Sequence, residues 1–382
     1  MRQFTIANPL LYGVCCDGEK VGVMMGGFKE KYLKKGSEPY FIAEIGINHS
    51  GLFDLAKRMI DDSKKAGADG VKFQKRDFSA LLHPDVEVPN PNGYLSKDEN
   101  DFPDETKAFG TWAYPDKRLE LSDEEILDLW KYAETIGLDF IVSPWENNSV
   151  DFLVKNGAKC LKLASIDTTN YMFCEYIASK GVPTIVSTGM TNYHQQSIVW
   201  DIFQKAKCSM MFLHCTSAYP SPLEDKNLRC IFLMKEMFGC DIGFSGHAID
   251  MEGTLGAVAL GANVIEKHVT LSRNMSGPDH AAALEFAEFA DLVTKARNMV
   301  VALGTGRKSF LDSEKTLHGV LCRKIVLKKN INKGSKISKD DLTTFVTNKE
   351  GGVLPEAYYE VVGAIAQKDL VKNQILEIVD YK

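Results

Sequence analysis

Two histidines and a carboxylate lie at the ends of neighbouring apolar runs between Ile242 and Asp279. His247 follows the run IGFSG, and Glu266 and His268 lie within the run VIEKHVT. Residues two apart on a strand point to the same side, so Glu266 and His268 would share a face. A single histidine is most often a hydrogen-bonded core residue. Two histidines at strand ends, with Asp279 on the loop beyond, favour a hard-metal or a proton-transfer site.

Two lysines lie inside apolar runs, where an unpaired ammonium group would be costly. They are Lys72 in GVKFQK and Lys162 in KCLKLA. Each could reach the rim or pair with Glu44 or Glu266, and a lysine of this kind could also form a Schiff base with a substrate. Alternatively, the two lysines could hold an anion that carries a phosphate and a carboxylate group. This last interpretation is favoured by the hydroxyl groups nearby, those of Ser165, Ser187 and Ser245.

The elements that must position these residues alternate regularly along the chain. Apolar runs of strand length occupy residues 40–46, 70–75, 139–143, 159–164, 183–187, 209–215, 241–245 and 263–268. Stretches with helical periodicity occupy residues 55–67, 123–136, 147–156, 170–180, 192–206, 225–238, 251–261 and 285–303. Eight such units across about 265 residues predict an α/β fold, a (β/α)₈ barrel, which typically takes about 250 residues. A doubly wound open sheet is the alternative, but no Gly-rich dinucleotide fingerprint follows the first strand.

Polar residues are concentrated at the carboxyl ends of the predicted strands, where active sites form in barrels of this type. In strand order they are Glu44, Asn48 and His49; Lys72 and Gln74; Ser143; Lys162 and Ser165; Ser187, Thr188 and Gly189; Thr216, Ser217 and Tyr219; Ser245 and His247; and Glu266 and His268. So many polar groups at one mouth are not needed for stability alone. Beside a metal, Glu44 could serve as a general acid or base.

The composition is that of a soluble globular protein. Of the 382 residues, 45% are hydrophobic and 25% are charged, which excludes fibrous and disordered classes. The net charge of −6 argues against nucleic acid as the main partner, although a local basic pocket could still bind an anionic substrate. No apolar run reaches the roughly 18 residues that a membrane helix needs, so we expect no membrane association.

The cysteine pattern and the N-terminal sequence together predict a cytoplasmic protein. Nine cysteines are scattered along the chain without a CxxC pair, which is typical of reduced thiols rather than of a disulfide framework or a zinc cluster. Cys215 lies near a strand end and could be a nucleophile, but a small buried filler is the favoured interpretation. The opening MRQFTIANPLLYG lacks a basic segment followed by a long apolar core, so it predicts no secretory signal.

Changes in composition and in the spacing of apolar residues predict three parts of the chain. These are an irregular leader (1–37), the barrel (38–306) and a small β-rich domain (307–382). Within the barrel, residues 76–119 interrupt the alternation, and a connection of that length is typical of a lid or a binding loop. Within the small domain, NINKGSKIS (330–338) and DLVKNQILE (369–377) share one pattern, in which an apolar residue is followed by a lysine, a turn and a second apolar residue. The shared pattern predicts weak internal pseudo-symmetry.

Several longer motifs resemble those of the sialic acid synthase family. The matching segments are IAEIGINHSG (42–51), GADGVKFQK (67–75), LKLASIDTTN (161–170), STGM (187–190), LHCTSAYP (213–220), IGFSGH (242–247), VIEKHVTL (264–271) and GPDH (277–280). They follow the family's order and span nearly all of residues 40–306. The C-terminal part resembles the antifreeze-like (SAF) domain that this family appends to its TIM barrel. CTSAYP, SGH and the long loop after FQK are closer to the animal-type sialic acid phosphate synthases than to the common bacterial type.

The resemblance implies a reaction and residues for it. The family condenses phosphoenolpyruvate with an N-acyl-mannosamine-type sugar. A divalent metal, Mn²⁺ or Mg²⁺, polarises the open-chain aldehyde, C3 of the enolpyruvate attacks it, water adds at C2, and phosphate leaves with cleavage of its C–O bond. The implied metal ligands are His247 and His268, and Glu44 would assist proton transfer. Phosphoenolpyruvate would be held by Lys72, Lys162, Ser165, Ser187 and Ser245, and the sugar by Gln74, Ser143, Ser217, Tyr219, Glu266 and Asp279.

Two departures from the family pattern concern the sugar and the small domain. Bacterial relatives have Asn where this chain has Ser217, so the acyl-sugar preference stays open. The family's small domain also carries an Arg-Pro-Gly turn whose arginine reaches the partner subunit's site, which implies a domain-swapped homodimer. Here the stretch reads TNKEGGVLP (347–355), with Asn348 or Lys349 nearest that arginine. Lys349 can supply a cation but not a bidentate fork, or the small domain only covers the barrel mouth.

Alternative functions stay open at this point. The acceptor could be N-acetylmannosamine, its 6-phosphate, mannose 6-phosphate or a diacetamido sugar of the legionaminate or pseudaminate type. Lys117 and Arg118 could bind a 6-phosphate, although a solvated charge pair is the simpler interpretation. Another metal-dependent aldolase, an isomerase or a hydrolase could use the same barrel. A non-catalytic sugar-binding or ice-binding protein is disfavoured, because every proposed catalytic position holds a residue capable of its role.

Overall fold

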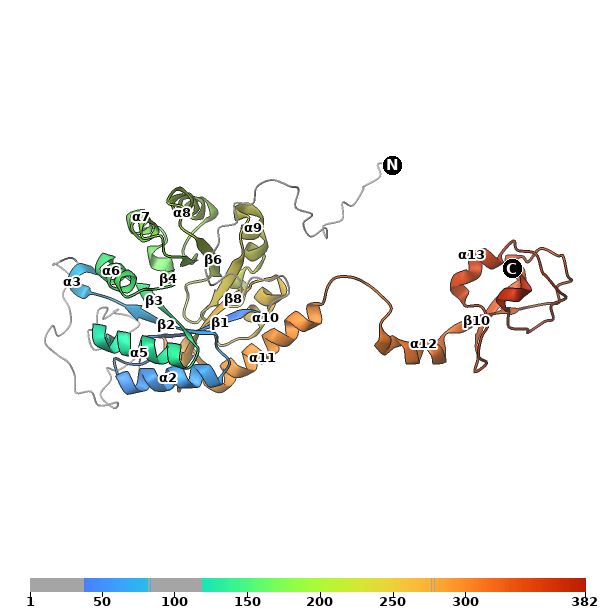
Figure 1. Ribbon diagram of the computed structural model, residues 1–382, viewed down its shortest axis with the longest axis horizontal. Helices are drawn as coiled ribbons and strands as arrows, with labels where there is room; N and C mark the ends of the chain where they lie inside the picture. The colour runs from blue at the N-terminus through green and yellow to red at the C-terminus, as the bar shows by residue number, and fades with distance from the viewer. Residues whose placement is uncertain (1–37, 82, 84–118, 276, 278) are drawn as a thin grey trace. The chain divides into compact units, whose positions relative to one another are not determined.

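The computed structural model describes residues 38–81, 83, 119–275, 277 and 279–382. Within it the chain divides into two compact units, Met1–Thr305 and Gly306–Lys382 (Figure 1). In the part of the chain that the model describes, no helix is both long and apolar enough to cross a membrane.

The predicted leader and most of the predicted lid, including Lys117 and Arg118, lie outside the described residues. At the start of the predicted lid, Phe78–Leu81 form a short helix, α3, where we expected irregular structure. The side chain of Asp77 accepts hydrogen bonds from the backbone N–H and the hydroxyl of Ser79, which stabilises the first turn of this helix.

The first unit is a closed barrel of eight parallel strands. They are β1 (Tyr40–Gly46), β2 (Gly70–Lys75), β3 (Asp139–Pro144), β4 (Leu161–Leu163), β5 (Thr184–Ser187), β6 (Met210–Cys215), β7 (Ile242–Gly246) and β8 (Val264–Thr270). Each strand pairs with the next in the chain, and β1 also pairs with β8, with Glu44 opposite His268. The closure confirms the predicted (β/α)₈ barrel. It excludes the open doubly wound sheet, because such a sheet would leave two edge strands.

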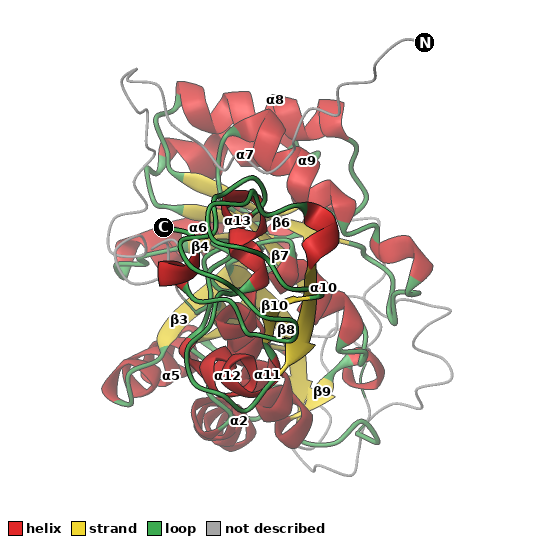
Figure 2. Ribbon diagram, turned by 90° about the vertical axis from the view of Figure 1, so that its right-hand side faces the viewer, coloured by secondary structure: helices red, strands yellow, loops and turns green. Residues whose placement is uncertain are grey.

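Helices follow the strands and surround them (Figure 2). They are α2 (Phe53–Lys65), α5 (Asp123–Thr135), α6 (Asn147–Lys155), α7 (Tyr171–Ser179), α8 (Tyr193–Lys205), α9 (Arg229–Phe238), α10 (Glu252–Ala259) and, after the two-residue strand β9 (Leu284–Glu285), α11 (Phe286–Leu303). Capping boxes begin α5 at Ser122 and α8 at Asn192. The helix predicted from residue 225 begins at Arg229 instead, because Asn227 has a left-handed backbone with a φ of 38°.

Side chains inside the barrel follow the alternation of a β-strand. Toward the amino ends of the strands the lumen is apolar and contains Tyr40, Ile42, Ile141, Cys160, Ile185, Met211, Leu213 and Val264. Two positions further along the same strands, and so on the same face, are Glu44, Ser143, Lys162, Ser187, Cys215 and Glu266. The intervening residues, such as Phe41 and Phe212, face the helices and belong to the large outer core. The strand period thus directs the polar residues into the barrel mouth.

The second unit, for which the sequence predicts a small β-rich domain, contains a two-stranded antiparallel sheet of β10 (Arg323–Leu327) and β11 (Leu342–Val346). Its short helices are α12 (Lys315–Leu321) and α13 (Tyr358–Val361). A separate hydrophobic core holds it together, with Leu327, Ile337 and Leu376 fully buried.

The two segments that share one pattern adopt matching conformations in this unit. Ile331 and Leu370 exchange backbone hydrogen bonds of 2.9 and 2.8 Å, so the segments pair with each other. Each segment then ends on a 3₁₀ turn that a buried aspartate closes. The Oδ2 of that aspartate accepts the backbone N–H three residues earlier, at 2.7 Å for Asp341 and 2.8 Å for Asp380.

Candidate active site

The first lysine of the barrel mouth is paired with a carboxylate from the neighbouring strand. Lys72 Nζ lies 2.8 Å from Glu44 Oε2, and it donates a hydrogen bond of 3.2 Å to Ser143 Oγ. Both charged side chains are at most 5% exposed. The pairing of Lys72 with Glu44, one of the interpretations left open by the sequence, is therefore present. It avoids the cost of an isolated buried charge.

The second lysine and a second carboxylate complete a buried cluster. Lys162 Nζ donates to Ser187 Oγ at 2.6 Å. Glu266 lies between the two lysines, with its Oε2 3.9 Å from Lys72 Nζ and 4.0 Å from Lys162 Nζ. Ser245 donates to the other oxygen, Oε1, of Glu266 at 3.0 Å. Glu266 and Ser143, which the resemblance assigned to the sugar, thus contact the residues expected to hold phosphoenolpyruvate.

Burial and the two lysines shift the pKa values of Glu44 and Glu266 in opposite directions. Burial raises the pKa of Glu44 to about 7, against the opposing effect of Lys72, and the nearby Glu266 raises it further. Burial also acts on Glu266, but Lys162 and Lys72 outweigh it and hold the pKa of Glu266 below its usual value. Glu266 is therefore the ionised partner, and Glu44 is the carboxyl group that can gain or lose a proton near neutral pH.

The two histidines meet at the same mouth, as the strand register requires. The ring centroids of His247 and His268 are 5.3 Å apart, and the ring of Tyr219 lies 4.2 Å from His247 and 5.8 Å from His268. His247 Nδ1 lies 2.9 Å from the carbonyl oxygen of Thr216, and we assign it as the donor. Its Nε2 then carries the free lone pair, which is the usual state of a metal-binding imidazole.

His268 is the second imidazole that could bind a metal. It is buried, and among the described residues its Nδ1 has no hydrogen-bond partner, although Asp279 Oδ2 lies 3.8 Å away. Burial, His247 and the lysines together hold the pKa of His268 well below its usual value, so the ring is neutral. No group of three or more His, Cys, Asp or Glu in the described ranges could hold a metal by itself. The residues fit a site with two protein ligands, in which substrate and water would supply the others.

A glycine makes room for two hydroxyl groups at the end of β5. The backbone N–H of Gly189 donates to Ser165 Oγ at 3.1 Å. A Cβ at this position would lie 2.1 Å from Ser217 Oγ and 2.8 Å from Ser165 Oγ. Cys215 is buried as expected, but its Sγ contacts Ser165 Oγ at 3.5 Å and His247 Nδ1 at 3.7 Å. It is therefore part of the site wall rather than a filler of the apolar core.

Sequence reasoning missed one residue that shapes this mouth, Gly46. It has a φ of 55°, and a Cβ there would lie 3.0 Å from Glu44 Oε1, 3.4 Å from Gln74 Nε2 and 3.5 Å from Asp279 Oδ2. Gly46 thus lets three predicted site side chains converge from three different segments. Its place at the end of the first apolar run was the available signal, since a glycine there allows the left-handed backbone.

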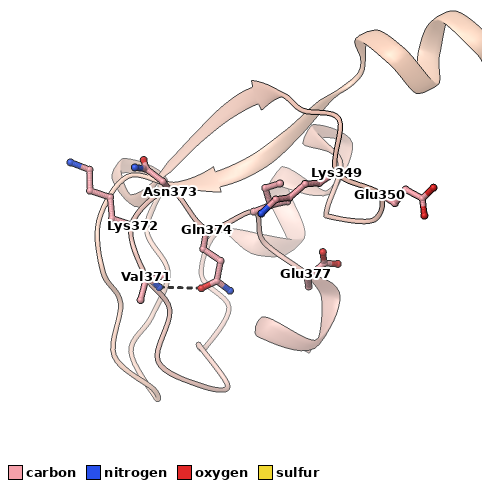
Figure 3. Close-up of a pocket in the computed structure, with 8 residues that line it drawn as sticks. Lys349, Glu350, Val371, Lys372, Asn373, Gln374 and Glu377 are labelled. Carbon is pink, nitrogen blue, oxygen red and sulfur yellow. Dashed lines mark hydrogen bonds between the residues drawn. The ribbon is translucent and has the colours of Figure 1, made fainter.

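Lys349, the residue expected nearest the family arginine, belongs to the second unit. It lines a hollow of about 380 Å³, from which Glu350 points away (Figure 3). The other lining residues are Val371, Lys372, Asn373, Gln374, Ile375 and Glu377. Within the second unit, the hollow contains both acidic and basic side chains, so its charge alone does not select a ligand.

Comparison with known proteins identifies the family. The NeuB family model matches residues 59–308, and the SAF domain model matches residues 323–381. The chain is 35% identical to the N-acetylneuraminate-9-phosphate synthase of Homo sapiens, over 90% of this chain and 94% of that one. It is 32% identical to the N,N'-diacetyllegionaminic acid synthase of Legionella pneumophila, over 85% and 89%.

A solved structure agrees with these sequence matches. It is the N-acetylneuraminic acid (sialic acid) synthetase of Leptospira borgpetersenii in complex with citrate, with 31% identity and a TM-score of 0.62, covering 74% of this chain and 90% of that one. The sequence motifs, the closed barrel with its polar mouth and the C-terminal sheet all agree with these matches. The chain therefore belongs to the NeuB family and carries a C-terminal SAF domain.

Proposed function

We propose that this NeuB-family chain is a sialic acid synthase. It condenses phosphoenolpyruvate with N-acetylmannosamine or its 6-phosphate and gives N-acetylneuraminate or its 9-phosphate, together with phosphate. The observation that carries the proposal is the buried cluster of Lys72, Lys162 and Glu266, with two imidazoles beside it in one barrel mouth. The similarity to the human and Leptospira enzymes supports the same reaction.

The cluster can hold phosphoenolpyruvate because it offers donors for both anionic groups of that substrate. Each lysine already donates to a serine hydroxyl, Lys72 to Ser143 and Lys162 to Ser187. Charge-assisted hydrogen bonds from ammonium and hydroxyl groups are what phosphate and carboxylate oxygens need. Ser165 and Ser245 extend the donor set on either side. The binding of this anion would replace part of the interaction between the lysines and Glu266.

The histidines and their neighbours would hold the sugar end of the reaction. His247 and His268 would bind Mn²⁺ or Mg²⁺, which as a Lewis acid polarises a carbonyl group. Tyr219 and Asp279 lie beside the histidines, Gln74 lies beside Glu44, and all three would orient the open-chain sugar. C3 of the enolpyruvate then bonds to the aldehyde carbon, and the aldehyde oxygen takes up one proton. Water adds at C2 and loses one proton. The C–O bond to phosphate then breaks as the new C2 hydroxyl becomes a keto group, and the hydroxyl proton leaves with the phosphate.

Glu44 is the group that we assign to proton transfer in this sequence. Its carboxyl is buried, and its pKa of about 7 leaves both protonation states populated near neutral pH. Lys72 holds it in place at 2.8 Å, and Gln74 Nε2 lies 3.5 Å from its other oxygen. This arrangement keeps the carboxyl oriented toward the mouth while it exchanges a proton.

A second acceptor class also has support, namely a diacetamido sugar of the legionaminate or pseudaminate type. The Legionella relative is named for such a product and is nearly as similar as the human enzyme. Both reactions need the same phosphoenolpyruvate site, so the lysine cluster does not discriminate between them. The choice depends on the sugar side, where Ser217 replaces the Asn expected from bacterial relatives.

We also propose a cytoplasmic homodimer in which the small domain (307–382) of one copy contributes to the barrel mouth (38–306) of its partner. Lys349 would then supply a cation at the rim in place of the family arginine. Sedimentation of the purified chain tests this, because a monomer that retains full activity would exclude the shared site. Lys349→Met should leave sedimentation unchanged and raise the KM for the sugar.

The decisive experiment is phosphate release from phosphoenolpyruvate in the presence of Mn²⁺. Parallel reactions would contain N-acetylmannosamine, its 6-phosphate, or a 2,4-diacetamido sugar, with a sugar-free reaction as the control. The proposal requires release that depends on one of the first two sugars. Release only with the diacetamido sugar would favour the second acceptor class, and release without any sugar would contradict a synthase.

A further inference from the structure

A buried lysine, paired with a half-buried carboxylate, lies next to the candidate active site without belonging to it. Lys226, in the 3₁₀ turn Glu224–Lys226, is 4% exposed, and its Nζ lies 2.9 Å from Asp250 Oδ2. The same ammonium group donates to the carbonyl and the hydroxyl oxygen of Ser221, at 3.2 and 3.0 Å. Its three donors are thus all used within the protein, so Lys226 is not arranged to bind a ligand.

The surroundings are shaped to hold this lysine. Asp250 Oδ1 accepts the backbone N–H of Gly253 at 3.1 Å, so both oxygens of the carboxylate have a partner. A Cβ at Gly253 would lie 2.6 Å from the Cδ of Lys226, so only a glycine lets the lysine chain pass. A second buried lysine, Lys267, donates to the carbonyl oxygen of Ala248 in the same loop. A buried ammonium group whose three donors all have partners, as in Lys226, specifies one geometry, and removal of one partner is costly.

This cluster fixes the loop that follows β6 (residues 216–228) against the loop that follows β7. The backbone N–H of Ser221 donates to the carbonyl oxygen of His247 at 2.7 Å. Farther along the loop, the carbonyl oxygen of Lys226 lies 2.6 Å from His214 Nε2, on β6 itself. Tyr219 lies in the same loop two residues before Ser221, and its ring is 4.2 Å from that of His247. The cluster therefore bonds to the backbone of His247 through Ser221, which is two residues along the chain from the ring that packs on this imidazole.

We propose that Lys226 is a positioning residue, which locks the loop that follows β6 so that Tyr219 and His247 keep the arrangement needed to bind the metal and the sugar. The inference rests on the proposed function, both for the sugar kinetics and for the metal site at His247 and His268. Without the ammonium group, Asp250 would lose its partner beside the chain of Lys226, and the loop would keep its backbone contacts with His247 and His214 but lose the side-chain contacts that join Ser221 to Asp250. Phosphoenolpyruvate binding should be spared, because Lys72 and Lys162 are held by other strands.

The test compares Lys226→Met with Lys295→Met. Methionine keeps most of the lysine chain's volume, and Lys295 forms an exposed ion pair with Asp291 on α11, so it controls for the loss of a lysine charge. We expect Lys226→Met to raise the dissociation constant for Mn²⁺, measured by electron paramagnetic resonance of the free ion, about 10-fold. The KM for the sugar should rise similarly, while the KM for phosphoenolpyruvate stays within about 2-fold. Lys295→Met should change none of these.

A double-mutant cycle separates positioning from general destabilisation. If the lock acts through Tyr219, then Lys226→Met should change Mn²⁺ affinity by less than about 2-fold in a Tyr219→Ala background. An undiminished effect in that background, or an equal rise in both KM values, would overturn the proposal. Asp250→Asn, which keeps the acceptor for Gly253, serves if Lys226→Met does not fold. If no sugar yields product, the Mn²⁺ measurements still decide the positioning role, so failure of the proposed function remains distinguishable.

Discussion

The barrel mouth and the small domain both bury carboxylates beside lysines, but the geometry differs. In the small domain, Lys329 lies 2.6 Å from Asp341 and Lys368 lies 2.7 Å from Asp380, and each carboxylate also accepts a backbone N–H. In the mouth, Glu266 Oε2 has two lysines at 3.9 and 4.0 Å and no hydrogen bond from any described residue. The small-domain charges complete turns, whereas Glu266 in the mouth lies far enough from both lysines for a ligand to take its place beside them.

The lysines of the small domain are exposed, whereas those of the barrel mouth are buried. The lysine side chains of the small-domain pairs are 64% and 55% exposed, so little desolvation opposes their contacts. Those of Lys72 and Lys162 are 5% and 2% exposed, which is expensive for an ammonium group. A protein keeps such a cost where it serves binding or catalysis. We therefore expect charge removal to cost stability in the small domain and activity in the mouth.

The largest expected effect is that of His268→Ala on turnover. Loss of one of two imidazole ligands should lower kcat about 1000-fold, since metal polarisation contributes several kcal/mol to reactions of this kind. The fold should survive, because among the described residues His268 Nδ1 has no hydrogen bond to lose. Steady-state kinetics and circular dichroism measure the two properties. His194→Ala, on the exposed side of α8, is the matched control, and normal turnover of His268→Ala would remove the metal assignment.

A crossed pair of substitutions tests the comparison directly. Glu266→Gln should lower kcat/KM about 100-fold, because a preorganised charge is lost, and should change the free energy of unfolding by less than about 1 kcal/mol. Asp380→Asn should cost about 2 kcal/mol of stability, because a charge-assisted hydrogen bond is lost, and should leave kcat/KM within about 2-fold. Denaturant unfolding and steady-state kinetics of both variants supply the four values. The distinction between the two regions fails if the two variants lose stability equally.

Glu44 should make the stability of the barrel depend on pH in the sense opposite to Asp341 of the small domain, whose pKa is lowered. Its pKa is raised from 4.5 in the unfolded chain to about 7 in the folded one. A raised carboxyl pKa contributes stability that is complete below the unfolded value and is lost as pH rises through the folded one. Between about pH 5 and 7 the loss should be about 2 kcal/mol. Glu44→Gln should remove this slope in metal-free unfolding experiments, and parallel curves for the two proteins would refute the shift.

The smallest predicted effect is that of Gly189→Ala. The new Cβ would collide with Ser217 Oγ and Ser165 Oγ, both at the ends of side chains that can rotate away. We expect the KM for phosphoenolpyruvate to rise about 10-fold through displaced donors, with little change in stability. Gly181→Ala is a control that adds a methyl group next to open space, although its φ of 68° carries backbone strain. Kinetic constants at saturating sugar would show whether the hydroxyls matter.

The sequence was sufficient to predict the strands, and through their period the residues that face the mouth. Ile42 and Glu44 are two apart on β1, so their common face follows from the chain alone. The partner of each charge did not follow, because the position of Glu266 between Lys72 and Lys162 depends on how distant strands align. Gly46 was overlooked for the same reason, since the side chains that it admits come from β1, β2 and the loop after β8.

Local boundaries failed where a single residue overrides the periodicity. The helix expected from residue 225 shows helical spacing, yet Asn227 takes a left-handed backbone and delays the helix to Arg229. The delay leaves Lys226 in a separate turn, where its side chain enters the buried pair with Asp250. Periodicity predicts which face of a segment is apolar, but it does not predict that a turn at Asn227 separates Lys226 from the helix.

The pairing of β1 with β8 places Glu44 opposite His268, the first and the last strands of the barrel. During synthesis, Glu44 is therefore made more than two hundred residues before His268. Until β8 has emerged and docked, Lys72 and Lys162 lack the carboxylate of Glu266, and an unfinished barrel carries excess positive charge in its lumen. The last strand closes the sheet and neutralises that charge in one event. A fragment that ends before β8 lacks Glu266 and His268, so the site is complete only when the whole barrel has formed.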